Sequence, residues 1–153
     1  MPANTAPIFT LTPNIGRAQI TTTYAQTKSD GTSSGTSADI MVKAFTAGAN
    51  GSYVDKVRFN SVGTASTTSV ATTLRVYLST IASPGATIGG TDTFLLADIA
   101  TAAATTSSTT AASTQYEINI GIAIPSGTYI HVSQAVAQTT NQFWQAAVIG
   151  GDY

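Results

Sequence analysis

The residues capable of acid–base or nucleophilic chemistry are few and widely separated in this sequence. His131 is the only histidine and Glu117 the only glutamate among 153 residues. A serine nucleophile needs a base held in place by a third group, and the many serines single out none of themselves for that role. We therefore expect no catalytic residues, and we interpret His131 as a surface or interface residue of a strand.

Metal and glycosidase sites are equally poorly supported by the acidic residues. These are dispersed along the chain, at Asp30, Asp39, Asp55, Asp92, Asp98, Glu117 and Asp152. They match no calcium-loop spacing, and nothing pairs Glu117 with an aspartate as a two-carboxylate glycosidase requires. The absence of cysteine excludes disulfides and thiolate metal sites. The sequence predicts no metal ligands and no cofactor.

Charge is sparse and argues against several partners. Charged residues make up 8% of the chain and the net charge is −1, against about 25% charged residues in ordinary soluble domains. The basic residues are scattered, at Arg17, Lys28, Lys43, Lys56, Arg58 and Arg75. A nucleic-acid binder would cluster them on one face, and a polybasic membrane anchor would group them in one segment. We expect neither nucleic acid nor membrane as a partner.

Short alternating segments predict an all-β fold. In Gln115 to Ile122, four apolar residues alternate with polar ones, which is typical of a half-buried strand. Comparable segments cover 15–24, 40–46, 52–60, 73–80, 93–99, 128–134 and 143–149. They predict a single β-sandwich, jelly-roll-like, with about eight or nine short antiparallel strands. Residues 15–153 form this domain, and the proline-punctuated residues 1–14 form an N-terminal arm or an edge strand.

The parity of side chains predicts which residues face the core. In 52–60 we expect Tyr53, Val57 and Phe59 to point inward, and Lys56 and Arg58 to point outward with Val54. Trp144 is expected in the core, as large aromatic residues of a sandwich usually are. An exposed Trp144, or tyrosines clustered at loop ends, would instead favour glycan binding.

Three stretches resemble the small virion-associated proteins of tailed bacteriophages. They are the opening Ala6-Pro7-Ile8-Phe9-Thr10-Leu11-Thr12-Pro13-Asn14-Ile15-Gly16, the middle Phe45-Thr46-Ala47-Gly48-Ala49-Asn50-Gly51-Ser52 with Val54-Asp55-Lys56-Val57-Arg58-Phe59, and the ending Ile149-Gly150-Gly151-Asp152-Tyr153. The resemblance is most marked to capsid decoration (cement) proteins. It implies a β-rich structural protein, often trimeric, that clamps neighbouring major capsid subunits and has no catalytic residues.

The resemblance and the composition together define the expected function. We expect a structural virion protein that binds the major capsid protein, forms a homotrimer, and lies on the capsid surface after assembly in a bacterial cytoplasm. The start of the sequence shows no signal peptide, which fits that location. Ile8, Phe9 and Leu11 are the expected partner-binding residues. The alternatives are a tail or fibre module that binds host-surface glycans and, with less support, a depolymerase or esterase.

Overall fold

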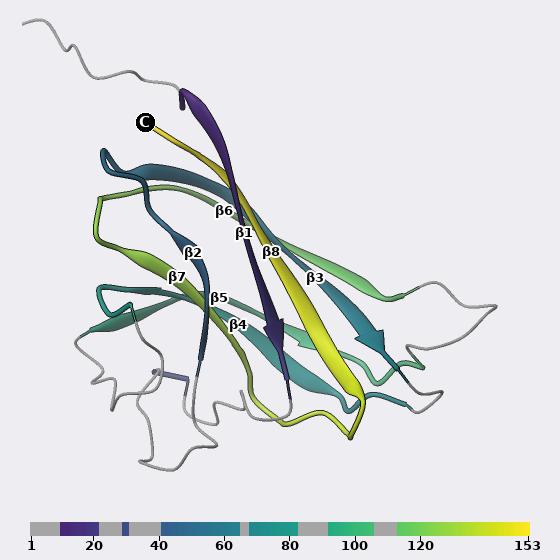
Figure 1. Cartoon of the computed structure of the whole chain (residues 1–153). Coiled ribbons are helices and arrows are strands. Elements are labelled where there is room, and N and C mark those ends of the chain that lie inside the picture. The colour runs from purple at the N-terminus through teal and green to yellow at the C-terminus, as the bar shows by residue number, and fades with distance from the viewer. Residues whose placement is uncertain (1–9, 22–28, 31–40, 65–67, 83–91, 106–112) are drawn as a thin grey trace, which may run out of the picture.

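The computed structural model describes residues 10–21, 29–30, 41–64, 68–82, 92–105 and 113–153. Within these ranges the chain forms eight strands and no helix (Figure 1). The strands are β1 (Thr12–Ile20), β2 (Val42–Thr46), β3 (Ser52–Gly63), β4 (Thr72–Ser79), β5 (Thr93–Thr101), β6 (Gln115–Ile124), β7 (Tyr129–Gln134) and β8 (Gln142–Asp152). This confirms the all-β prediction.

The strands form two four-stranded antiparallel sheets that face each other. The first sheet has the order β1-β8-β3-β6 and the second has the order β2-β7-β4-β5. Strand β1 therefore pairs with β8, β2 with β7, β3 with β6 and β4 with β5. The first four strands thus pair in order with the last four taken in reverse. This is the strand order of an eight-stranded jelly roll, so the predicted sandwich class is confirmed.

The core fills the space between the sheets with alternate residues of both. The inward side chains include Trp144 and Val148 of β8, Val57 and Phe59 of β3, Leu74 and Val76 of β4, and Ile130 and Val132 of β7, all fully buried. The ring of Trp144 meets the ring of Tyr116 edge to face, with centroids 5.7 Å apart, a favoured geometry for aromatic pairs. The prediction that Trp144 lies in the core is confirmed.

A β-bulge in β3 overturns part of the predicted parity. The register with β6 and β8 shifts between Val54 and Lys56, so Asp55 is an extra residue that reverses the alternation. Val54 is fully buried, whereas Tyr53 is 37% exposed on the outer face. The expectation that Tyr53 points inward and Val54 outward is therefore wrong, because strict alternation cannot continue through a bulge.

Two strands also extend beyond the predicted segments. Strand β8 continues to Asp152 and not only to Ile149, and Gly150 permits this because a Cβ there would overlap the backbone oxygen of Tyr53. Strand β1 begins at Thr12 and lies at the edge of the first sheet. The last part of the segment 1–14 is therefore already sheet, and residues 1–9 lie outside the described residues.

A hydrogen-bond network secures the end of β8. The carboxylate of Asp152 accepts hydrogen bonds from Asn14 Nδ2 of β1, at 2.9 and 3.1 Å, and from Ser52 Oγ of β3. Ser52 Oγ in turn accepts one from the backbone N–H of Gly48, at 2.8 Å. Asp152 thus joins β1, β8, β3 and the turn before β3, which fixes the register at this end of the sheet.

The edges of the two sheets come close together where β1 passes β2. Gly16 of β1 faces Ala44 and Phe45 of β2, and a Cβ at Gly16 would overlap the backbone oxygen of Ala44. Only glycine allows the backbones to come this near without displacing a strand. Gly16 therefore determines how tightly this side of the sandwich closes.

We predict that Gly16→Ala destabilises the fold by about 3 kcal/mol, because the new methyl group must push β1 away from β2. Gly127→Ala is the matched control: Gly127 has φ of +75° but no atom within 4 Å of an added Cβ. It should cost only about 1 kcal/mol, from backbone strain alone. Urea unfolding followed by tryptophan fluorescence measures both values, and equal losses in the two variants would contradict the close approach.

Candidate binding surface

The outer face of the first sheet carries side chains in regular rows, because β8 pairs with β1 on one side and β3 on the other. Its cross-strand partners define the rows. From β1 to β6 the rows are Gln19–Gln145–Asn60–Gln115, Arg17–Ala147–Arg58–Glu117 and Ile15–Ile149–Lys56–Asn119. An amide row, a charged row and a partly apolar row thus follow one another along the strands.

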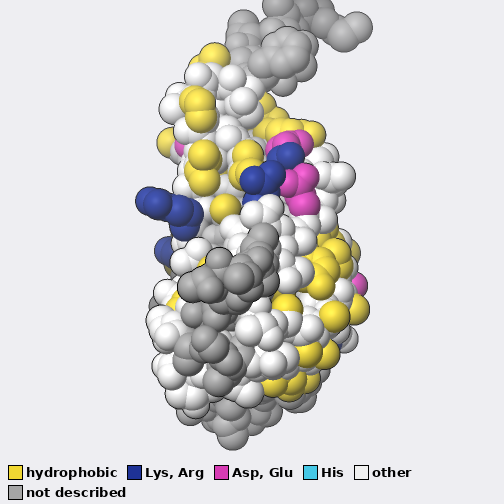
Figure 2. Space-filling view, turned by 90° about the vertical axis from the view of Figure 1, so that its right-hand side faces the viewer, with side chains coloured by type: hydrophobic (Ala, Val, Ile, Leu, Met, Phe, Trp, Pro, Cys, Tyr) yellow, Lys and Arg dark blue, Asp and Glu magenta, His cyan; other side chains and the backbone are white. Residues whose placement is uncertain are grey.

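One end of this face is apolar. Leu11 is 73% exposed, Ile15 is 61% exposed, and Tyr53 lies nearby on β3. With Ile149, which lies between Ile15 and β3, these residues make up what we call the apolar end. Figure 2 shows hydrophobic side chains in the upper half of this face, beside basic and acidic ones, and a second group of them in the lower half. Contiguous exposed apolar residues on a soluble protein mark an interaction surface.

The charged row and the partly apolar row beside it share an ion-pair group on β3 and β6. Glu117 accepts from Lys56 Nζ at 3.1 Å and from Arg58 Nη2 at 2.9 Å. The hydrogen bond from Arg58, followed by that from Lys56, lowers the pKa of the Glu117 carboxyl below its ordinary value. Glu117 therefore stays ionised at neutral pH, which does not suit a general acid.

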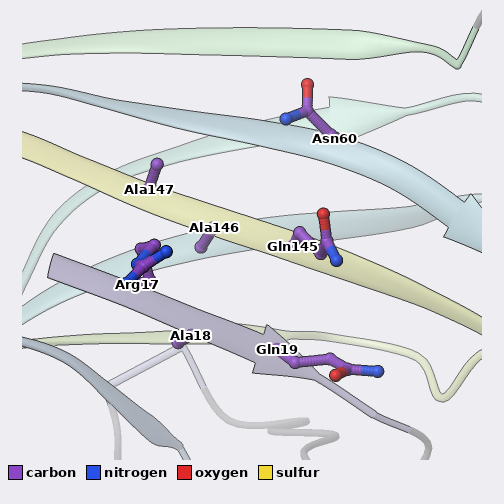
Figure 3. Close-up of a pocket in the computed structure, with 7 residues that line it drawn as sticks. All are labelled: Arg17, Ala18, Gln19, Asn60, Gln145, Ala146 and Ala147. Atoms are coloured by element: carbon purple, nitrogen blue, oxygen red, sulfur yellow. The ribbon is translucent and has the colours of Figure 1, made fainter.

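Between the strands lies a shallow trough of about 440 Å³ on the same face (Figure 3). Its polar lining comes from Arg17 and Gln19 of β1, Gln145 of β8 and Asn60 of β3. Its remaining lining comes from the small residues Ala18, Ala146 and Ala147. The volume falls within the range of ordinary ligand sites, about 300–1,000 Å³.

Of the residues predicted to bind a partner, Leu11 belongs to the apolar end. Its backbone N–H donates to the carbonyl of Asp152 at 2.8 Å, so the ladder continues past the start of β1 and holds Leu11 on the sheet. Ile8 and Phe9 lie outside the described residues.

His131 is not a surface residue, and that interpretation was wrong. It lies on the outer side of β7 with 0% exposure, between Lys43 of β2 and Tyr77 of β4. Its ring stacks on that of Tyr129 with centroids 6.3 Å apart, and Lys43 Nζ lies 5.2 Å from the Tyr129 ring centroid. Strand alternation identified the outer side of the sheet but could not show that this part of it is buried.

The surroundings of His131 keep its ring neutral. Burial, followed by the positive charge of Lys43, lowers its pKa from 6.5 to about 4. Neither ring nitrogen has a hydrogen-bond partner among the described residues. A catalytic histidine needs a group that orients it and a nucleophile within reach, and no described residue is hydrogen-bonded to the His131 ring.

The serines give no catalytic arrangement in the described part of the chain. Ser52 is fully buried, and its hydrogen bonds to Asp152 and Gly48 hold the turn and the strand end together. Gly31-Thr32-Ser33-Ser34-Gly35 does match the Gly-x-Ser-x-Gly pattern of a nucleophile elbow. This stretch lies outside the described residues, and the pattern by itself assigns no role.

The described ranges contain neither a metal-ligand cluster nor a membrane-spanning helix. No group of three or more His, Cys, Asp or Glu side chains there could hold a metal ion. No helix in those ranges is long and apolar enough to cross a membrane.

No protein-family model matches the chain, and no curated protein is similar to it in sequence. The surface described above therefore has to be interpreted from its own chemistry.

Sequence reasoning missed the trough. The alternation of Arg17 with Gln19, and of Gln145 with Ala147, was the only available signal. Those pairs lie far apart in the chain, and only the register of β8 brings them into adjacent rows.

We predict that His131 makes stability fall between pH 6.5 and pH 4. In this window the unfolded chain binds a proton at the imidazole and the folded chain does not, so stability rises with pH and the contribution is complete above pH 6.5. The loss at pH 4 from this group is about 3 kcal/mol. Because carboxylates also titrate there, unfolding free energies of the wild type and His131→Gln should be compared at each pH.

The wild-type curve should be steeper than that of His131→Gln across the window. An NMR titration of the wild-type imidazole provides a second reading that does not depend on the stability of the variant. Parallel stability curves together with an imidazole pKa near 6.5 would contradict the burial of a neutral ring.

Proposed function

We propose that the protein is a structural virion component, a capsid decoration protein that binds and stabilises the major capsid lattice through several weak contacts. The observation that carries this proposal is the apolar end, where Leu11 and Ile15 are exposed by 73% and 61%. Exposed apolar side chains on a strand whose backbone is hydrogen-bonded within a sheet are suited to become buried against another protein.

The two outer faces of the sandwich differ in a way that supports this use. On the second sheet, the outward side chains His131, Ser133 and Tyr77 are fully buried. On the first sheet, Leu11 and the outward side chains of β1 as far as Gln19 are exposed. Of the two, the first sheet therefore offers the continuous surface for a partner.

The fold and the composition add general support. Jelly rolls occur in viral capsid proteins and in lectins, although a fold alone does not determine a function. A chain with 8% charged residues gains little solubility from its own charge, which suits a protein held in an assembly. A homotrimer would present several apolar ends to the lattice at once, and linked weak contacts add up to strong attachment.

The alternative, a tail or fibre module that binds glycans by aromatic stacking, has less support. Trp144 was the side chain that could have carried it, and it is fully buried in the core. Tyr116, which packs against Trp144, points into the core as well.

The double variant Leu11→Ser with Ile15→Ser should lose attachment to the capsid. Both side chains are largely exposed, so the fold is retained while the apolar contact is removed. We expect at least about a tenfold weaker association in cosedimentation with capsids that lack the protein, since burial of each large apolar side chain is worth about 1.5–3 kcal/mol.

Phe94→Ser is the matched control for that experiment. Phe94 is 68% exposed on β5, at the edge of the second sheet and away from the apolar end. It should bind capsids as the wild type does. Retention of full binding by the double variant, or an equal loss in Phe94→Ser, would show that the apolar end is not the capsid contact.

A further inference from the structure

The trough on the first sheet gathers four polar side chains whose hydrogen-bonding capacity is unused. Within the described ranges, no hydrogen bond or ion pair engages the side chains of Arg17, Gln19 or Gln145. Asn60 Oδ1 is buried without a partner. Figure 3 shows these side chains spread over three neighbouring strands, with Asn60 on the far side of β3 from Gln145 and Arg17. A buried acceptor without a partner costs stability.

The register explains why these groups come together. Gln145 lies between Gln19 and Asn60 in the amide row, and Arg17 lies one row further along β1. The residue of β8 that pairs with Arg17 is Ala147. Its side chain is only a methyl group, so the space beside the Arg17 guanidinium stays open. On the other side of Ala147, Arg58 is tied to Glu117, so Arg17 is the guanidinium that remains for a ligand.

The lining specifies the chemistry of that ligand. The planar guanidinium of arginine binds a carboxylate through two parallel hydrogen bonds. A primary amide both donates and accepts, which matches a hydroxyl group that also does both. Three amides and one arginine around the methyl group of Ala147 and the strand backbone at Ala18 and Ala146 therefore suit a molecule with several hydroxyl groups and one carboxylate.

We propose that this trough binds an acidic saccharide, with the carboxylate of a uronate-type sugar on Arg17 and its hydroxyl groups on Gln19, Asn60 and Gln145. The inference requires that the capsid contact of the proposed function be confined to the apolar end, so that the amide row stays accessible. The trough is open and its lining contains no aromatic ring, so it suits one unit of a polysaccharide bound weakly, with strength gained by repetition.

An extended acidic peptide fits the same place less well. Peptides that bind sheets use the free backbone groups of an edge strand, but the trough lies across β1, β8 and β3, where β8 is paired on both sides. The trough also offers no apolar pocket for a peptide side chain.

The test is an NMR titration of the full ¹⁵N-labelled chain with a hyaluronan tetrasaccharide. We expect shifts at the backbone of Arg17, Gln19, Asn60 and Gln145 and at the amide side chains of the last three. Arg17→Gln should raise the Kd by at least about tenfold, and the carboxyl-reduced tetrasaccharide should bind the wild type equally poorly. Gln145→Ala should weaken binding by a smaller factor.

Lys56→Gln is the matched control, because it removes the same charge from the same face outside the trough. Its Kd should stay within about twofold of the wild type. The proposal is overturned if no shifts occur at the trough, if Lys56→Gln and Arg17→Gln weaken binding equally, or if tetraglutamate binds there as tightly as the tetrasaccharide. The second result would mean unspecific ionic attraction, and the third a site for acidic peptides.

Discussion

The register of β8 between β1 and β3 is the constraint on which the rest of the structure depends. Its inward residues, Trp144 and Val148, fill the centre of the core, while its outward residues set the rows of the outer face. A shift by a single residue would exchange these two sets. It would place Gln145 in the core and the indole of Trp144 in water, so burial and surface pattern are fixed by one pairing.

Local features hold that register at both the end and the side of the sheet. Asp152 accepts hydrogen bonds from β1 and β3 at the end of β8, and Gly150 lets the strand pass close to Tyr53. Gly16 closes the side where β1 meets β2. On the outer face of the first sheet, this register sets the positions of the apolar end, the ion pairs and the amide row relative to one another. Preorganised surfaces of this kind lose less free energy on binding.

Much of the fold could be predicted from the sequence, because alternation reports burial directly. The segment that became β6 and the core position of Trp144 were predicted correctly on that basis. The bulge at Asp55 could not be predicted, since an inserted residue leaves no mark on composition and reverses the parity of Tyr53 and Val54. The burial of His131 was missed because it depends on what covers the outer side of β7, which the strand's own pattern does not contain.

The candidate surface was less accessible to sequence reasoning than the fold. Leu11 could be singled out because it lies in an apolar segment punctuated by prolines. The trough depends on the pairing of Gln19 with Gln145 and of Gln145 with Asn60, contacts between residues far apart in the chain. Without the register, arginine and glutamine on an edge strand look like ordinary solvated residues.

Cryo-electron microscopy of virus particles assembled with this protein tests the central proposal, that the apolar end of the first sheet meets the capsid. The account predicts density for the jelly roll over the capsid lattice, at local or quasi-threefold positions, with Leu11 and Ile15 against the major capsid protein. Density only at the tail, absence from the particle, or an apolar end facing solvent would contradict it.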